Sequence, residues 1–586
     1  MTSMDESLPM FREGFLAEVY RERPAETDGT SSVTTRFPPE PNGFLHLGHS
    51  KAIAINFGFA KSHGGQCILR FDDTNPAAEE ERYFTAIRDI ISWLGFTPAR
   101  ITYSSDKFDR LYELAEELIL RDGAYVCHCS ATEIKKQRGY IIEQDKFGGP
   151  RYACAHRDRP VNESVAELRA MRDGKYTASQ AVLRMKQDLG SNNPQMWDLA
   201  AYRVLDAAPP HFRTGSKWKI YPTYDFTHCL CDSFESITHS LCTTEFELSR
   251  ISYEWLCDKL EVYKPMQREY GRLNITGTVM SKRKIADLIK NGHVSDWDDP
   301  RLYTLIALRR RGIPPGAILA FVNELGVTKA SATIETHRFE QTARRYLELT
   351  VPRLMMILDP IAVVIEDLPE DYLEMIEVPF GKDPAFGTHK VPFTNKVYID
   401  RSDFREVASK DFFRLAPGKP VGLLKVPFPI TATSFDKDET SGAIKTVYAK
   451  YERPQDGASF KKPKSYIQWI ADSPAHHSPR RATAKVFAPL LLPAAAGSDP
   501  KSPSLNPESL RMYPDAMVET GFEEIWRSAP WPKAAGEPEK TLSAVQPECV
   551  RFQATRVGYF CVDKGSTLEE PVLNQVVSLK EDRGKS

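Results

Sequence analysis

Two histidines, His46 and His49, form the first pair of side chains in this sequence that could do chemistry. Because they are three residues apart, they share one face of a helix, and near its first turn they can donate hydrogen bonds to a phosphate. Gly48 places no side chain between them, which would let a nucleotide approach the backbone closely. A His-x-x-His pair alone is more often a chance surface pair, so the surrounding residues decide the interpretation.

The surrounding residues predict a strand, a turn and a helix that position these histidines. A strand-like stretch begins at Val33, the turn is Pro39-Glu40-Pro41-Asn42-Gly43, and a helix is expected from about 46 to 63. Residues 67–71 then read as a second strand, which makes a βαβ unit and implies a parallel sheet. Asp72 follows that strand, at the edge where open α/β sheets bind ligands.

Four motifs together resemble class I aminoacyl-tRNA synthetases of the glutaminyl and glutamyl branch. His46-Leu47-Gly48-His49 is similar to the first signature of that class, and Val279-Met280-Ser281-Lys282-Arg283-Lys284 is similar to the second. Residues 70–76 (Arg-Phe-Asp-Asp-Thr-Asn-Pro) and 221–229 (Tyr-Pro-Thr-Tyr-Asp-Phe-Thr-His-Cys) also match the branch. The resemblance extends from about residue 30 nearly to the end, and is closest to glutaminyl-tRNA synthetases of eukaryotic type.

The length of 586 residues predicts several domains, roughly three to five by the usual size of a domain. The resemblance implies a Rossmann-type α/β nucleotide-binding catalytic domain with an inserted acceptor-binding domain, a helical linker domain and two C-terminal β-barrels. The expected boundaries are a flexible tail at 1–29, the catalytic domain at 30–122 and 213–265, the insertion at 123–212, the signature loop and helical domain at 266–354, the anticodon-binding barrels at 355–575 and a tail at 576–586.

The resemblance also implies the reaction. Glutamine would be activated by ATP, with Mg²⁺, to glutaminyl-adenylate and then transferred to tRNA(Gln). Catalysis would rest on His46, His49 and the mobile Lys282, which stabilise the charge on the phosphates. The positions expected around ATP are Glu40, Pro41, Asn42, His46, Leu47, Gly48, His49, Ser50, Lys51, Ala52, Thr243, Arg272, Leu273, Met280, Ser281 and Lys282.

Arg36, Asp72, Tyr224 and His228 match positions of the family's amino-acid pocket, where Asp72 would pair with the substrate ammonium. Each has an ordinary alternative, namely a surface ion pair for Arg36, a helix cap for Asp72 and a core position for Tyr224. Cys242 stands where the glutamyl enzymes carry arginine, and a buried carboxylate without a cation would be costly. Glutamine is therefore favoured, with a glutamyl-tRNA synthetase or a noncatalytic tRNA-binding paralogue as the alternatives.

Three cysteines and a histidine, Cys127, Cys129, Cys154 and His156, form a C-x-C-x24-C-x-H pattern inside the expected insertion. Three thiolates and an imidazole suit tetrahedral zinc, which would hold the insertion together. The alternative is a set of buried structural cysteines, because C-x-C is tighter than the usual zinc spacing. A structural Zn²⁺ is the prediction, without a part in the reaction.

In the C-terminal region, Arg405, Gln553 and Arg556 lie in segments that match the anticodon-contacting segments of the glutaminyl branch. Their side chains can donate hydrogen bonds to unstacked bases. The alternative, that they are ordinary surface residues, is equally strong from the sequence.

The composition sets limits on the class of protein. An apolar fraction of 41%, a charged fraction of 27% and a net charge of -2 describe an ordinary folded chain without a general attraction to polyanions. RNA binding must then use local basic runs, such as 282–284, 309–311 and 480–481, although most such runs are solvated faces.

Location and partners follow from the same limits. The longest apolar stretch, near Val486, is broken by prolines, and the acidic N-terminus does not read as a signal peptide. The ten scattered cysteines favour reduced thiols. We expect a cytoplasmic monomer that binds tRNA(Gln), glutamine and ATP, and no DNA or membrane, with membership of a multi-synthetase complex as the alternative.

Overall fold

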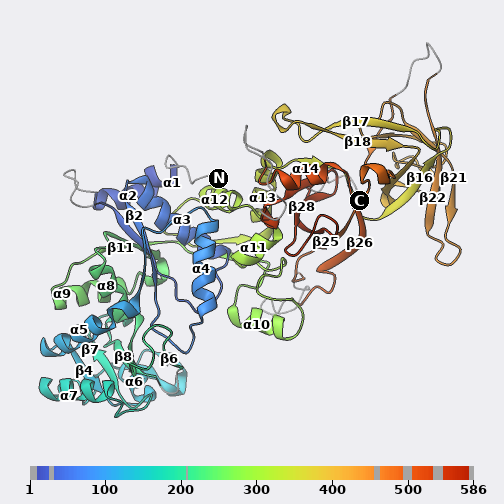
Figure 1. The fold of residues 1–586 in the computed structure, drawn as a ribbon. Coiled ribbons are helices and arrows are strands. Elements are labelled where there is room, and N and C mark those ends of the chain that lie inside the picture. The colour runs from blue at the N-terminus through green and yellow to red at the C-terminus, as the bar shows by residue number, and fades with distance from the viewer. Residues whose placement is uncertain are drawn as a thin grey trace. The chain divides into compact units, whose positions relative to one another are not determined.

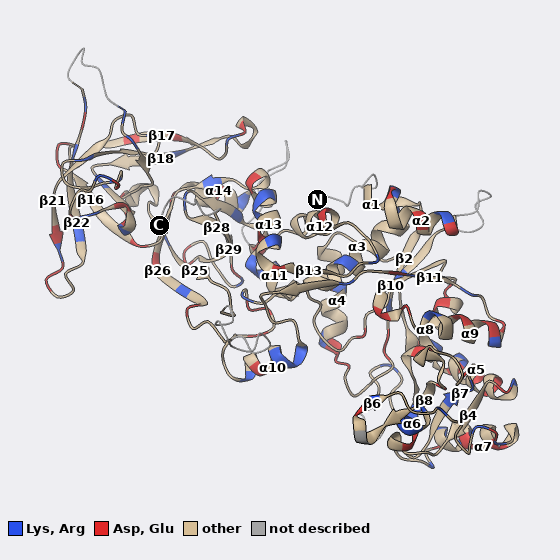
Figure 2. Ribbon diagram, turned by 180° about the vertical axis from the view of Figure 1, so that it is seen from behind, with Lys and Arg blue, Asp and Glu red and all other residues tan. Residues whose placement is uncertain are grey.

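The computed structural model describes residues 9–24, 32–205, 209–454, 462–492, 504–531 and 545–579. The chain divides into two compact units, residues 1–275 with 321–334, and residues 276–320 with 335–586 (Figure 1). Each unit is described by itself. Acidic and basic residues are interspersed along the elements of both units (Figure 2), as the balanced charge of the sequence predicts.

The first unit contains the predicted βαβ arrangement. Strands β1 (Thr34–Phe37), β2 (Gln66–Phe71) and β3 (Arg100–Tyr103) form a parallel sheet in the order β1-β2-β3, and helix α3 (Leu47–Ser62) connects the first two. Nearly all of α3 is buried, because it packs on β1 and β2. The predicted order of strand, turn, helix and parallel strand is confirmed.

A second parallel pair in this unit lies next to the first sheet. Strand β10 (His239–Thr243) pairs with β11 (Met266–Tyr270), and the Thr238 N–H donates to the Thr34 carbonyl over 2.9 Å. Helices α4 (Glu81–Trp93), α8 (Tyr224–Phe234) and α9 (Arg250–Leu260) and the two-stranded pair β12 (Leu273–Thr276) and β13 (Ala332–Glu335) belong to the same part of the chain.

The inserted region has an antiparallel sheet of four strands, in the order β4-β7-β8-β9. Helices α5 (Phe108–Leu120) and α7 (Val161–Arg172) share a hydrophobic core with this sheet. The sequence assigned the strand near 218–224 to the catalytic domain, and this is wrong: β9 pairs with β8, with Tyr202 opposite Pro222. An apolar strand does not specify its sheet. The remaining elements are β4 (Ala124–Cys127), α6 (Ala131–Gln137), β5 (Tyr140–Ile141), β6 (Lys146–Phe147), β7 (Val182–Met185), β8 (Ala200–Val204) and β9 (Ile220–Pro222).

The expected N-terminal tail is wrong for residues 9–24, which form helices α1 (Pro9–Arg12) and α2 (Gly14–Glu22). Leu16 is fully buried, and the Tyr20 ring stacks on His63 with 3.7 Å between the ring centroids. These apolar side chains have a partner surface, which a flexible tail would not need. The rest of the predicted tail, residues 1–8 and 25–29, lies outside the described residues.

The second unit contains two seven-stranded sheets, which confirms the predicted change to β structure. One has the order β14-β27-β28-β29-β25-β26-β15 and the other β23-β20-β21-β22-β16-β19-β24. Their strands are β14 (Arg353–Leu354), β15 (Met356–Ile357), β16 (Pro360–Ile365), β19 (Lys396–Asp400), β20 (Pro420–Leu423), β21 (Ile430–Lys437), β22 (Ile444–Tyr451), β23 (Tyr466–Ile467), β24 (Ile470–Ala471), β25 (Arg480–Phe487), β26 (Leu510–Val518), β27 (Arg551–Ala554), β28 (Gly558–Val562) and β29 (Val572–Ser578).

The other elements of the second unit are a hairpin and helices. They are β17 (Leu373–Pro379) with β18 (Thr388–Thr394), and α10 (Lys282–Lys290), α11 (Leu305–Arg311), α13 (Thr336–Thr350) and α14 (Gly521–Arg527). Helix α12 (Pro315–Leu325) has residues in both units. In the part of the chain that the structure describes, no helix is both long enough and apolar enough to cross a membrane.

The stretch 473–508 contains β25 with Ala484 fully buried, while its residues 493–503 lie outside the described residues. One prediction for the second unit is wrong. The expected C-terminal tail from 576 begins inside β29, where Val576 and Val577 are buried in the sheet, and residues 580–586 are not described.

The basic run 309–311 was a candidate for RNA binding, and the structure instead pairs its arginines within the second unit. They contact Glu548, Asp563 and Glu340 over 2.5, 2.8 and 3.0 Å, respectively. These ion pairs attach α11 to helix α13 and to the ends of β27 and β28. In the sequence the three adjacent arginines look like a basic patch for RNA, because the acidic residues that pair with them lie far away along the chain.

Candidate active site

A cavity of about 560 Å³ opens in the first unit where its parallel strands end. It is lined from β1 and β2 by Arg36 and Asp72, and from β10 and β11 by Cys242 and Tyr270. This is the carboxyl edge at which open parallel sheets bind ligands. The full lining is Arg36, Phe37, Pro38, Glu40, Ala52, Asn56, Asp72, Thr74, Asn75, Arg203, Thr223, Tyr224, Leu241, Cys242, Thr243, Phe246 and Tyr270.

His46 and His49 lie side by side at the N-terminus of α3, with 3.8 Å between their ring centroids. The Gly48 N–H donates to His46 Nδ1 over 3.1 Å, and the His46 N–H donates to His49 Nδ1 over 3.0 Å. Since both Nδ1 atoms accept, each neutral ring must carry its proton on Nε2. The helix terminus therefore holds two oriented Nε2–H donors, as an anion site requires.

The histidines are neutral in this structure. Burial, and then the positive charge of Arg272, lower the pKa of His46 to about 4. Burial, His46 and Arg272 lower the pKa of His49 to about 3. Neutral rings can donate hydrogen bonds without burying two adjacent positive charges when no anion is bound.

The structural reason for Gly48 differs from the one that the sequence suggested. A Cβ atom at this position would lie 2.9 Å from the Leu273 carbonyl oxygen and 3.0 Å from His46 Cε1. Glycine is therefore needed for the close approach of β12 and for the histidine rotamer, rather than only for the approach of a nucleotide.

Several residues expected around ATP are occupied by protein contacts. The Lys51 ammonium is buried and donates to the Gly271 carbonyl over 2.7 Å, while the Ser50 hydroxyl donates to the Leu47 carbonyl over 2.6 Å. These side chains fix α3 rather than extend toward a ligand. Of the other expected positions, the cavity is lined by Glu40, Ala52 and Thr243. The Arg272 side chain pairs with Glu245. Three positions are buried, namely Pro41, Leu47 and Leu273, and Asn42 is half-buried.

Met280, Ser281 and Lys282 belong to the second compact unit. Ser281 caps helix α10, because its hydroxyl accepts the Lys284 N–H over 3.5 Å, and Lys282 is the first residue of that helix and exposed. The structure thus places the second signature at a helix N-terminus of its own.

Asp72 and Glu40 are the two acidic groups that line the cavity, and Asp72 is the one expected to pair with an ammonium ion. Burial raises the pKa of its carboxyl to about 6, against the opposing effect of Arg70. The Ser104 hydroxyl lies 3.5 Å from its Oδ1 atom. A carboxylate that is costly to ionise in the empty cavity would be stabilised by an ammonium ion.

Arg36 lies at the centre of a buried charge network rather than on the surface. Its Nε donates to Asp232 over 3.0 Å, one Nη1 N–H donates to the Leu241 carbonyl, and both Nη2 protons go to Ser240 and His228. Four of its five N–H groups are thereby used, which leaves one for a ligand. The surface ion pair that was the alternative for Arg36 is excluded, since its side chain is 1% exposed.

Tyr224 lines the cavity, but His228 does not. The two rings stack with 4.8 Å between their centroids, and His228 lines a separate small cavity behind Tyr224. Because Arg36 can only donate, His228 Nε2 must accept from it, and burial lowers the pKa of His228. Of the four residues expected to bind glutamine, three meet at one cavity, and His228 positions two of them.

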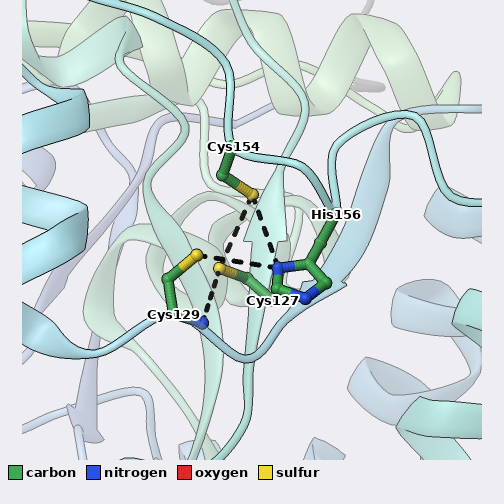
Figure 3. A group of neighbouring side chains, drawn as sticks. All are labelled: Cys127, Cys129, Cys154 and His156. Carbon is green, nitrogen blue, oxygen red and sulfur yellow. Dashed lines mark hydrogen bonds between the residues drawn. The ribbon is translucent and has the colours of Figure 1, made fainter.

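The four predicted zinc ligands converge, as Figure 3 shows. Their donor atoms all lie within 4.8 Å of one another, and the Sγ atoms of Cys127 and Cys154 are 3.7 Å apart. His156 Nδ1 lies 3.6 Å from Cys129 Sγ and 3.8 Å from Cys154 Sγ. A tetrahedron with Zn–S bonds of about 2.3 Å has edges of about 3.8 Å, so the arrangement fits zinc.

The three residues predicted to contact the anticodon all lie in the second unit, and two of them are linked through Asp403. Arg556 donates to the Tyr466 carbonyl over 2.8 Å and lies 3.7 Å from Asp403, two residues before Arg405. The guanidinium of Arg405 covers the Phe412 ring at 4.4 Å. Gln553 Oε1 is buried without a hydrogen-bond partner among the described residues, which is unusual for a surface glutamine.

Sequence reasoning missed Asp232, the carboxylate at the centre of the charge network. Asp232 accepts from Arg36, Arg70, Ser240 and Tyr253, and these charges hold its pKa well below the usual range against the effect of burial. Its position four residues after His228 on a helix was the available signal. Arg203, Phe246 and Tyr270 also line the cavity, and no motif pointed to them.

Comparison with known proteins gives consistent results. The family model for class I tRNA synthetases (E and Q), catalytic domain, matches residues 32–349, and the anti-codon binding domain of the same group matches residues 351–452. A probable glutamine–tRNA ligase of Schizosaccharomyces pombe is 57% identical over 98% of this chain and 72% of its own length. Glutamine–tRNA ligases of Saccharomyces cerevisiae (53%; 98% and 73%) and Bos taurus (44%; 94% and 66%) are also similar.

Proposed function

The chain belongs to the class I tRNA synthetases for glutamate and glutamine, and we propose that it attaches glutamine to tRNA(Gln) through a glutaminyl-adenylate. The observation that carries the proposal is the cavity with Asp72 and Cys242, which is also lined by Ala52 and Asn56 of α3, the helix that begins at the paired histidines. It supports a Rossmann-type nucleotide site assembled from the parallel sheet β1-β2-β3 and the parallel pair β10-β11. The glutamate alternative and the noncatalytic alternative are not favoured.

The amino-acid end of the cavity is suited to an amide. Burial raises the pKa of the Cys242 thiol to about 12, so this wall carries no charge, and Arg36 is balanced by Asp232. A side-chain carboxylate placed there would lack a dedicated counter-charge. The substrate ammonium would pair with Asp72, and Arg203 supplies a cation for the α-carboxylate or the α-phosphate.

The phosphate end uses the helix terminus. His46 and His49 donate from Nε2 to the triphosphate, and the α3 dipole favours the same negative charge. Lys282 would follow the departing pyrophosphate as a compact cation. Mg²⁺, which ATP brings, neutralises phosphate charge. Positioning and electrostatic stabilisation then suffice, because the reaction needs no protein nucleophile.

We also propose that Arg405, Gln553 and Arg556 contact the anticodon. Support comes from the contact of Arg556 with Asp403, two residues before Arg405, and from the buried Gln553 amide oxygen without a partner among the described residues. We expect the enzyme to act in the cytoplasm, because a relative from Arabidopsis thaliana that is 42% identical is named a cytoplasmic glutamine–tRNA ligase.

We propose in addition that the four-residue cluster holds a structural Zn²⁺. The sulfur of Cys129 accepts a hydrogen bond from the Gln137 amide, and that of Cys127 accepts from the Cys129 N–H. Such donors are typical around metal-bound thiolates. The ion would connect the loop after β4 with residues 154–156 and would not take part in the reaction.

The test of function is aminoacylation of purified tRNA(Gln) and tRNA(Glu), each with labelled glutamine or glutamate, with and without ATP. ATP-dependent charging of tRNA(Gln) with glutamine alone is the expected result. Charging with glutamate would refute the account of the Cys242 wall, and tRNA binding without any charging would refute the enzyme assignment.

A further inference from the structure

We propose that His211 is a positioning residue for the amino-acid site. It fixes the loop of residues 72–75 through Asp73 and thereby places the Asp72 carboxylate in the cavity. Neither His211 nor Asp73 is among the residues that line the cavity. The inference rests on the proposed function, because it matters for catalysis only if Asp72 binds the substrate ammonium.

The His211 ring is oriented from both sides. Its Nδ1 atom accepts from the Arg213 and Thr214 N–H groups, each over 3.1 Å, so the neutral ring carries its proton on Nε2. That Nε2–H donates to the Asp73 carbonyl over 2.9 Å. The imidazole side chain is fully buried, with the Phe108 ring at 5.6 Å.

The loop itself is fixed at further points, and the Asp72 N–H donates to the Pro39 carbonyl over 3.1 Å. The Asp73 carboxylate accepts from the Ser105 N–H over 2.8 Å and from its hydroxyl over 2.6 Å. The Glu79 carboxylate accepts from the Asn75 N–H over 2.6 Å. His211 is the contact that comes from the inserted region, so it ties the loop to a second structural element.

The charges around His211 explain why a neutral donor is used. The carboxylates of Asp73 and Glu79 each lie 3.7 Å from its Nε2, and Arg213 is the nearby cation. Burial raises the pKa values of Asp73 and Glu79 to about 7 and 8, while it lowers that of His211. A neutral imidazole can hold the Asp73 carbonyl whether or not these carboxyls ionise.

Substitution of His211 tests the proposal, because it should raise KM for glutamine and leave KM for ATP nearly unchanged. His211→Leu leaves the buried Asp73 carbonyl without its donor, and we expect KM for glutamine to rise about tenfold. KM for ATP should stay within about twofold and kcat within about threefold, since the histidines of α3 are untouched. His211→Gln retains an N–H donor and should restore KM for glutamine to within about threefold of the wild-type value.

Two companion variants make the result decisive. His63→Leu removes another buried-ring contact of the same unit, the stack on Tyr20, and should leave both KM values unchanged. Ser105→Ala loosens Asp73 from the other side and should raise KM for glutamine about threefold, which decides the matter even if His211→Leu does not fold.

Equal rises in both KM values, a loss of kcat alone, or an unchanged KM for glutamine in Ser105→Ala would overturn the inference. So would a folded His211→Gln protein as impaired as His211→Leu. Failure of the proposed function would appear separately, as absence of glutamine charging by the wild-type protein.

Discussion

Replacement of Asp72 by asparagine tests the central electrostatic argument for the amino-acid site. The pKa of Asp72 is raised by burial from an ordinary value of 3.8 to about 6, so ionisation in the empty cavity costs up to about 3 kcal/mol. A bound ammonium offsets this cost through a charge-assisted hydrogen bond worth about 1.5–3 kcal/mol. Asp72→Asn retains the shape and removes the charge, so kcat/KM for glutamine should fall about 10- to 150-fold.

The pH dependence has a definite sign. Only the ionised carboxyl attracts the ammonium, so glutamine affinity is present above pH 6 and is lost as pH falls through about 6. KM for glutamine should rise about tenfold per pH unit below that value in the wild-type enzyme and stay flat in Asp72→Asn. Because the folded-state pKa is raised, the buried charge opposes folding above about pH 4, and the variant should not lose thermal stability.

The assay is aminoacylation with glutamine varied at saturating ATP and tRNA(Gln), between pH 5.5 and 8. Asp109→Asn is the matched control, since that carboxylate is 72% exposed and pairs with Lys217 on the surface. Unchanged kcat/KM in Asp72→Asn, or the same pH profile in both enzymes, would show that Asp72 does not bind the ammonium.

Three other predictions follow from the contacts. His49→Asn should lower kcat about 10²- to 10³-fold in steady-state charging with KM for glutamine nearly unchanged, because it removes one phosphate donor; a similar loss of glutamine affinity would contradict this. Protein purified without chelators should contain about one zinc per chain by elemental analysis, and the Cys154→Ser variant should contain none. A wild-type protein without metal would show that the four residues are buried structural side chains instead. Arg310→Met should destabilise the second unit by about 2–4 kcal/mol in calorimetry, because among the described residues Lys485 is then the only cationic side chain that pairs with Asp563. No loss of stability is expected if the ion pair is solvated.

The Arg310 pair also has a pH signature. Burial by itself would raise the pKa of Asp563, but hydrogen bonds from Arg310 and Lys485 lower it to about 2. Its stabilising contribution is therefore complete above the unfolded-state pKa near 4 and is lost as pH falls through about 2. The difference in stability between wild type and Arg310→Met should narrow over that interval, and a constant difference would refute the assignment.

Local patterns predicted what is local in this molecule. The turn at 39–43 and the apolar helix after His46 specify β1, α3 and β2, because these three elements follow one another directly along the chain. The pairing of β9 with β8 could not be read, since both candidate sheets accept the same apolar strand. The buried α2 was missed because its partner surface is supplied by residues such as His63, far along the chain.

The same distinction separates the site residues that were found from those that were missed. Motif residues such as Arg36 and Asp72 meet at the cavity, but Arg36 is held by Asp232, and the loop of Asp72 contacts His211 through Asp73. These partners lie 196 and 138 residues away in sequence. A helix spacing hinted at Asp232, whereas nothing local to His211 suggests that its proton is directed at the Asp73 carbonyl. Motifs thus predicted residues that line the cavity, while the residues that hold them in place require the fold.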